Sequence, residues 1–385
     1  MGCLRRTCFL PCEHPTCHGA PRTMLPLMLM SAALAQGPTI QADLHLDTPT
    51  QLLNQGLSLD APAGLEAGLA QLKAGGTNVV VQVLWPPRKT DHRVRAQALM
   101  TTLEAEFAAN PEVGLATSPA QARALVADGR IAMVVSMEGA HGLGSDDRWA
   151  ESFLEFYSRG LRLLGLTWSF SNQFAGSSGD RGGGVTPVGW ELIEMARARG
   201  VVLDVSHASR QTTMAVCKDS PAPVIASHSD AHALTAVARN LTDEEIRCIA
   251  QTGGVIGLNF HAPFVGKGAD VARVADHADH LAKVGGYGVV ALGSDFDGFI
   301  KKPKGLEHAG KVPALWAELA RRGWTEDQLR GVKGENFMRA WAAAQAAATR
   351  KRQTSASQAA GRPTGRRQRS HSPQSRGVPS AVTMG

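Results

Sequence analysis

The body of this 385-residue chain has very little cysteine, so no disulfide framework can hold its fold. Four of the six cysteines lie within the first 17 residues, and only Cys217 and Cys248 follow. The early cysteines are spaced C-x4-C-x3-C-x4-C, which does not match the C-x2-C spacing typical of zinc sites. Stability must come from a hydrophobic core, and hydrophobic residues make up 43% of the chain.

The sequence also lacks an apolar run that is long enough to span a membrane. The best candidate, residues 24–35, is too short, and it ends in Ala33-Leu34-Ala35, a small-x-small pattern suited to signal peptidase. We therefore expect residues 1–35 to form an N-terminal extension that contains a signal peptide. The protein would then be exported to the periplasm or the extracellular space, and without such processing it would be cytoplasmic.

Acidic residues are absent from the C-terminal end, where residues 350–385 contain eight Lys and Arg. The formal net charge is +6, but this end contributes +8 and residues 1–23 a further +2, which leaves residues 24–349 with a net charge of −4. The body therefore lacks the basic surface of a nucleic-acid-binding protein. Residues 349–385 are rich in Ser, Arg, Gln, Gly and Pro, so we expect a disordered basic tail.

Between these ends, short β-branched runs alternate with segments of helical period, which is typical of βα units around a parallel sheet. Eight strands are predicted, at 40–47, 78–85, 131–138, 161–168, 201–207, 223–228, 254–260 and 288–295. Helices are predicted at 61–74, 92–109, 187–199, 210–217, 242–251, 271–284, 312–322 and 325–348. Eight such units favour an α/β fold of the (β/α)8 TIM barrel type over residues 36–348.

Five of the predicted strands end in a side chain that can bind a metal ion. These are His45 and Asp47 on the first strand, Glu138 on the third, His207 on the fifth, His228 on the sixth and Asp295 on the eighth. The carboxyl ends of the strands carry the chemistry in such barrels, so we expect these side chains to meet at one mouth. His45 and Asp47 are two residues apart on a strand and therefore point to the same face.

Imidazoles and carboxylates together suit zinc or a similar divalent ion. Five ligands exceed the need of one tetrahedral catalytic zinc, which indicates two ions that share a carboxylate. Glu138, alone at the end of its strand, is the natural bridge. A single His or Asp at a strand end more often serves as a cap, but the joint occurrence at the same end of different strands favours a binuclear metal site.

Six short motifs follow one another along the predicted barrel. They are DLHLDTP at 43–49, MEG at 137–139, GVTPVGWELIEMARARGVVLDVSHAS at 184–209, ASHS at 226–229, RNL at 239–241 and GSDFDG at 293–298. In this order they resemble motifs of the membrane dipeptidase (renal dipeptidase) family, peptidase family M19, among the amidohydrolase-like metal-dependent hydrolases. The matches run from about residue 41 to 340, so the resemblance covers the whole predicted barrel.

The resemblance implies a zinc-dependent dipeptidase that holds two zinc ions. His45, Asp47 and Glu138 would bind one ion, and Glu138, His207 and His228 would bind the other. A hydroxide held between the ions would attack the peptide bond, because shared metal ions lower the pKa of bound water.

The resemblance also implies roles in substrate binding and proton transfer. Arg239 would pair with the free carboxylate of a dipeptide, a use suited to its planar fork. Asp295 would move a proton from the attacking water to the leaving amine. Asp297 could be confused with it, and we prefer Asp295 because it stands first after the strand.

The end of the fourth predicted strand departs from the family pattern. Animal dipeptidases have L-T-H there, with a His thought to help bind the substrate carbonyl, whereas this chain has Leu166-Thr167-Trp168. Trp168 cannot bind a metal ion or carry a proton, although its indole N–H can donate one hydrogen bond. We therefore expect Trp168 to contact substrate and to alter the substrate range.

Three functions remain open from the sequence alone. The first is a dipeptidase acting on small dipeptides, including those with a D-residue at the carboxyl end. The second is a metal-dependent amidohydrolase of the same fold that acts on another small amide or a lactone. The third is a non-catalytic binding protein of the cell envelope that uses the basic tail. The oligomeric state is also open, with a homodimer as one alternative.

Overall fold

The computed structural model describes residues 38–180 and 182–360. Contacts divide the chain before Ile40, and of the first unit only residues 38 and 39 are described, both exposed. The predicted signal peptide at 24–35 and the tail beyond residue 360 lie outside the described residues. All that follows concerns the unit that begins at Ile40.

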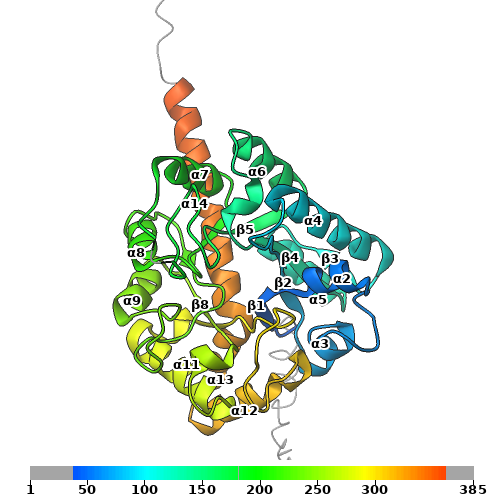
Figure 1. Ribbon diagram of the computed structural model, residues 1–385. Helices are drawn as coiled ribbons and strands as arrows, with labels where there is room; N and C mark the ends of the chain where they lie inside the picture. The colour runs from blue at the N-terminus through cyan, green and yellow to red at the C-terminus, as the bar shows by residue number, and fades with distance from the viewer. Residues whose placement is uncertain (1–37, 181, 361–385) are drawn as a thin grey trace, which may run out of the picture. The chain divides into compact units, whose positions relative to one another are not determined.

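Parallel strands form the predicted barrel at the centre of this unit (Figure 1). They are β1 (Ala42–Leu46), β2 (Val79–Leu84), β4 (Ile131–Met137), β5 (Leu161–Gly165), β6 (Val202–Asp204), β7 (Val224–Ile225), β8 (Ile256–Leu258) and β9 (Val290–Leu292). Ladders join β1 to β7 in the order β1-β2-β4-β5-β6-β7 and join β8 to β9. Single parallel bridges, Ala226 to Ile256 and Leu46 to Phe296, connect the two groups and close the ring.

Helices surround the strands, as Figure 1 shows. They are α2 (Thr48–Gln55), α3 (Leu69–Gly75), α4 (His92–Ala109), α5 (Pro119–Ala127), α6 (Trp149–Ser158), α7 (Pro187–Arg197), α8 (Arg210–Lys218), α9 (Asp243–Gln251), α10 (Ala262–Val265), α11 (Val271–Gly285), α12 (Pro313–Arg321), α13 (Glu326–Arg330) and α14 (Asn336–Ala360). The start of α9 follows its sequence signal, because Thr242 and Glu245 form a capping box.

Alternate strand residues fill the barrel interior. Ala42, Val79 and Ala132 belong to one buried cluster that also contains Phe337 and Trp341 of α14. The outward-facing residues belong to a second cluster, which joins the strands to the surrounding helices. Burial on both faces is the reason that the strands read as nearly continuous apolar runs.

A β-bulge in β1 sets the direction of two predicted ligands. Asp43 lies opposite Val80 of β2, but Leu46 lies opposite Gln82, so β1 holds one extra residue between them. Side chains alternate with a period of two, and one extra residue therefore exchanges the two faces. His45 and Asp47 consequently share the inward face with Ala42, which no reading of the sequence period predicts.

Several elements differ from the prediction. The helix predicted at 61–74 is mostly turn, and only α3 forms at its end. Helices α2, α5, α6 and α10 and a short strand, β3 (Val113–Leu115), were not predicted. Helix α14 continues to Ala360, past residue 349 where we expected the disordered tail to begin. The extension continues the alanine-rich run at 342–348 through Arg350, Lys351, Arg352 and Gln353, and Ala, Arg, Lys and Gln all have high helix propensity. Within the described residues, no helix combines the length and apolar character needed to cross a membrane.

Candidate metal centre

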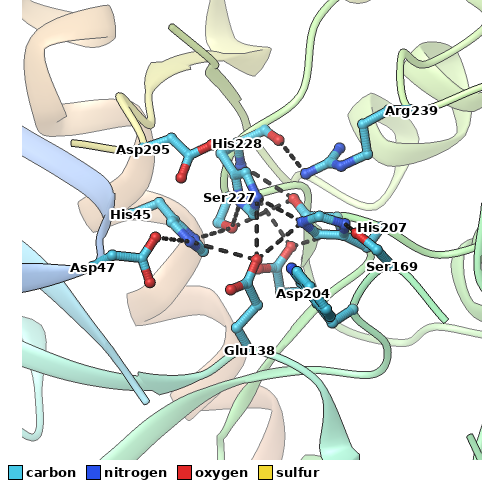
Figure 2. Close-up of polar contacts among 12 residues, drawn as sticks. His45, Asp47, Glu138, Ser169, Asp204, His207, Ser227, His228, Arg239 and Asp295 are labelled. Carbon is cyan, nitrogen blue, oxygen red and sulfur yellow. Dashed lines mark hydrogen bonds and ion pairs between the residues drawn. The ribbon is translucent and has the colours of Figure 1, made fainter. Parts of the chain in front are cut away.

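Three histidines surround one carboxylate oxygen at the carboxyl ends of the strands (Figure 2). The Oε1 atom of Glu138, directly after β4, lies 2.9 Å from His207 Nε2, 3.4 Å from His228 Nε2 and 3.6 Å from His45 Nε2. Asp47 Oδ2 lies 3.8 Å from His45 Nε2. The structure thus brings together all five predicted metal ligands, which come from four different strands.

Serine hydroxyls hold the other nitrogen of each imidazole. Ser227 Oγ lies 2.8 Å from His228 Nδ1 and 3.3 Å from His45 Nδ1, and Ser169 Oγ lies 3.3 Å from His207 Nδ1. Such partners orient a ligand and fix its tautomer. With Nδ1 occupied, the Nε2 atoms face the centre.

The local backbone is adapted to the site. His207 and Asp295 have φ values of 64° and 63°, in the left-handed region that residues with a side chain rarely adopt. Gly139, next to Glu138, has φ 89°, and a Cβ there would lie 2.3 Å from the His141 ring. Left-handed residues other than glycine cost about 1 kcal/mol or more and cluster at functional sites.

Asp295 and Asp297 have different surroundings, although they are two residues apart. Asp295 lines the central cavity beside Asp47 and accepts a hydrogen bond from Asn259 Nδ2 at 3.2 Å. Asp297 accepts from Thr48 Oγ1 and from the Glu66 backbone N–H, each at 2.7 Å. The carboxylate of Asp297 is therefore engaged in holding loops, and that of Asp295 faces the site.

Burial shifts the pKa values of the acids and bases in opposite directions. Burial, together with the nearby charge of Asp295, raises the pKa of Glu138 well above its usual range. Burial, together with the nearby charge of Glu138, raises the pKa of Asp47 well above its usual range. Burial lowers the pKa of His45 to about 3 and that of His228 well below its usual range. The crowded carboxylates and neutral imidazoles can all bind a divalent cation, and its charge would balance the negative charge of the carboxylates.

The donor atoms fit a zinc ion in chemistry and in availability. Imidazole nitrogen and carboxylate oxygen are typical zinc ligands. His45 Nε2 and Asp47 Oδ1 are buried and have no hydrogen-bond partner among the described residues, although a buried polar atom normally has one. Ligand atoms of His45, Glu138 and His228 lie within 4.8 Å of one another, as do those of His45, Asp47 and Asp295. The second group places Asp295 close to one half of the predicted site.

A cavity of about 290 Å³ opens onto this centre. Asp47, Glu138, His207 and Asp295 form its floor, and Trp168 is part of its wall. Arg239 lies beside His228, where its guanidinium donates to the His228 carbonyl at 2.6 Å and to Ser229 Oγ at 2.5 Å. The predicted substrate-binding residues therefore border the same site.

Sequence reasoning missed several residues of the site, among them Trp85, Asn259 and Ser227. Trp85 lines the cavity, Asn259 bonds Asp295, and Ser227 bonds two histidines. Trp85 and Asn259 stand at the ends of predicted strands, so the same survey of strand ends could have found them. Ser227 directly precedes His228, but nothing in the sequence links it to His45.

A parallel barrel with such a cluster at its strand ends defines the class of metal-binding (β/α)8 barrels. The family model of membrane dipeptidase (peptidase family M19) matches residues 31–355. The chain belongs to this family, and the resemblance inferred from its motifs is confirmed.

Individual relatives agree with this assignment. An uncharacterized dipeptidase of Schizosaccharomyces pombe is 37% identical over 224 residues, which are 56% of this chain and 53% of the relative. The dipeptidase aclJ of Aspergillus oryzae is 36% identical over 218 residues, which are 55% of this chain and 51% of the relative. The chain thus spans about half the length of the curated relatives it matches.

Among solved structures, a metallo peptidase from Rhodobacter sphaeroides liganded with a phosphinate mimic of the dipeptide L-Ala-D-Ala has a TM-score of 0.74 and 28% identity. The match covers 80% of this chain and 100% of that chain. The barrel predicted from the sequence is therefore confirmed by its relatives as well as by its own strand order.

Proposed function

We propose that this chain is a zinc-dependent dipeptidase. The observation that carries the proposal is the convergence of three imidazole Nε2 atoms on Glu138 Oε1, with Asp47 and Asp295 beside them, at the floor of a small cavity. Membership of the membrane dipeptidase family supports the same activity.

Two zinc ions fit the donor set, with Glu138 as the bridge. His45 and Asp47 would complete one site, and His207 and His228 the other. Bound zinc would lower the pKa of a water molecule between the sites and polarise the carbonyl under attack.

Arg239 is proposed to hold the carboxylate of the substrate. Its Nη atoms already donate to His228 and Ser229, and these two bonds fix the guanidinium plane beside the imidazoles. Its Nε atom has no hydrogen-bond partner among the described residues. A guanidinium held in this way can select substrates that end in a free carboxylate close to the scissile bond.

Asp295 is proposed to transfer the proton to the leaving amine. The hydrogen bond from Asn259 Nδ2 holds one carboxylate oxygen, and the group lies next to Asp47 in the cavity. Burial raises the pKa of Asp295 to about 6. A carboxylate that is held beside the reacting bond can accept a proton from water and donate it to nitrogen.

The substrates proposed include dipeptides with a D-residue at the carboxyl end. The ligand of the Rhodobacter sphaeroides protein, a mimic of L-Ala-D-Ala, supports this extension. Export by the segment at 24–35 remains a proposal of the same kind.

The test combines metal analysis of the purified full-length protein with a panel of L,L and L,D dipeptides. We expect two zinc ions per chain, hydrolysis of at least one dipeptide, loss of activity on chelation and recovery on adding zinc. Protein that holds two zinc ions and hydrolyses no dipeptide would contradict the proposed function.

A further inference from the structure

Two tryptophans line the cavity together with Glu138, the carboxylate proposed as the bridge. Trp85 directly follows β2, and Trp168 follows β5, and both of these strands pair with β4. The Glu138 N–H donates to the Leu84 carbonyl at 3.0 Å, which places Trp85 next to Glu138 in the ladder. The two indole rings meet edge to face with centroids 5.1 Å apart. We call Trp85 and Trp168 the tryptophan pair.

The tryptophan pair is firmly supported. Phe170 packs edge to face against Trp168 with centroids 5.8 Å apart, and Phe170 is buried. Phe299, which also lines the cavity, is 65% exposed and has φ 59°. An exposed aromatic side chain and a left-handed backbone both cost free energy. Packing within the protein therefore does not explain why Phe299 lies at the edge of the cavity.

The cavity offers no partner for a charged side chain. Among the described residues that line it there is no Lys or Arg, and the acids are Asp47, Glu138 and Asp295, all at the metal centre. Its volume, about 290 Å³, is just below the roughly 300–1,000 Å³ usual for small-molecule sites. The cavity therefore suits one sizeable apolar side chain.

The position of Arg239 determines which substrate residue meets the tryptophan pair. Figure 2 shows Arg239 and Glu138 on opposite sides of the His207 and His228 imidazoles. The Arg239 guanidinium carbon is 6.0 Å from the centre of the Phe264 ring, and Phe264 lines the same cavity as the tryptophan pair. A dipeptide with its carboxylate at Arg239 would extend its amino-terminal residue across the centre toward Glu138.

Resting on the proposed function, we infer that the tryptophan pair is a specificity subsite for the amino-terminal side chain of the dipeptide. It selects apolar side chains such as Leu or Phe, because burial of apolar area against aromatic faces is favourable, whereas a polar side chain gives up its hydrogen bonds to water there. The indole of Trp168 thus replaces the carbonyl-binding role of the family His with an apolar wall.

The experiment uses the zinc-loaded full-length protein and two matched substrate pairs. Leu-Gly and Asn-Gly differ in polarity at nearly the same size, and Gly-Leu and Gly-Asn place the same difference at the carboxyl end. The variants are Trp85→Ala, Trp168→Ala and Trp168→His. Trp190→Ala is the control, since Trp190 is a half-buried residue of α7 that does not line the cavity.

We expect the wild type to prefer Leu-Gly over Asn-Gly by about tenfold or more in kcat/KM, the discrimination typical of an apolar pocket. Each variant of the pair should reduce this ratio to below about threefold, and Trp190→Ala should keep it. Trp168→His retains a ring of moderate size, so its ratio remains informative if an Ala variant does not fold.

Three results would overturn the inference alone: equal rates for Leu-Gly and Asn-Gly, a preference that appears only in the Gly-Leu and Gly-Asn pair, or variants that keep the wild-type ratio. In each of these cases dipeptides are still hydrolysed, and the proposed function stands. A zinc-loaded wild type that cleaves none of the four substrates would overturn both.

Discussion

Replacement of Asp295 by Asn tests the proposed proton transfer with little change in shape. Asp295 is 9% exposed, and it accepts a hydrogen bond from the Asn259 side chain at 3.2 Å. Asn keeps the size of the group but cannot carry the proton. Loss of a general acid–base group lowers kcat by roughly 10²- to 10⁴-fold, equivalent to about 3–5 kcal/mol in the barrier. Zinc content should stay at the wild-type value.

Asp297→Asn is the matched control, because it makes the same chemical change two residues away. Asp297 bonds Thr48 and the Glu66 backbone and is not among the described residues that line the cavity. We expect kcat to stay within a few-fold of wild type and the free energy of unfolding to fall by about 1–2 kcal/mol.

Steady-state kinetics on one dipeptide, zinc analysis and urea unfolding of both variants provide the measurements. Full turnover by Asp295→Asn would refute its role in proton transfer. Loss of zinc from the same variant would show instead that Asp295 is a metal ligand.

Three further predictions follow from the structure. Arg239→Lys should raise KM for dipeptides about 10- to 100-fold, because a planar pair of donors is lost. The wild-type protein should also cleave C-terminally amidated dipeptides poorly. Equal rates on the free acid and the amide would argue against Arg239 as the residue that binds the substrate carboxylate. Burial lowers the pKa of His277 from 6.5 to about 4, and its ring bonds the Ala231 N–H and the Val265 carbonyl. The unfolded chain therefore binds more protons between pH 6.5 and 4, so stability should fall by about 3 kcal/mol as pH falls through this window. His277→Gln should remove that part of the pH dependence in urea unfolding, and an unchanged slope would contradict it. Deletion of residues 361–385 should leave kcat/KM within about twofold if the function is enzymatic, whereas a binding protein of the cell envelope would lose its partner.

The barrel was predictable because each of its strands can be recognised from its own short stretch of sequence. Strands buried on both faces require apolar runs such as residues 131–137, and these runs recur at the spacing of βα units. Helices with strong capping signals, such as α9, were also placed within a residue or two. The region at 61–74 was misjudged, because its apolar residues pack as turns against the core and only α3 becomes helical.

The residues of the candidate metal site could be chosen from the sequence by itself, since parallel strands in a barrel place all their carboxyl ends at one mouth, where His, Asp and Glu side chains can meet. The tertiary structure alone decided how they face one another. The bulge in β1 turns His45 and Asp47 inward, Ser227 holds His45 from 182 positions away, and the tryptophan pair forms across β4. Contacts of this kind depend on register and packing between strands, which the local sequence period does not encode.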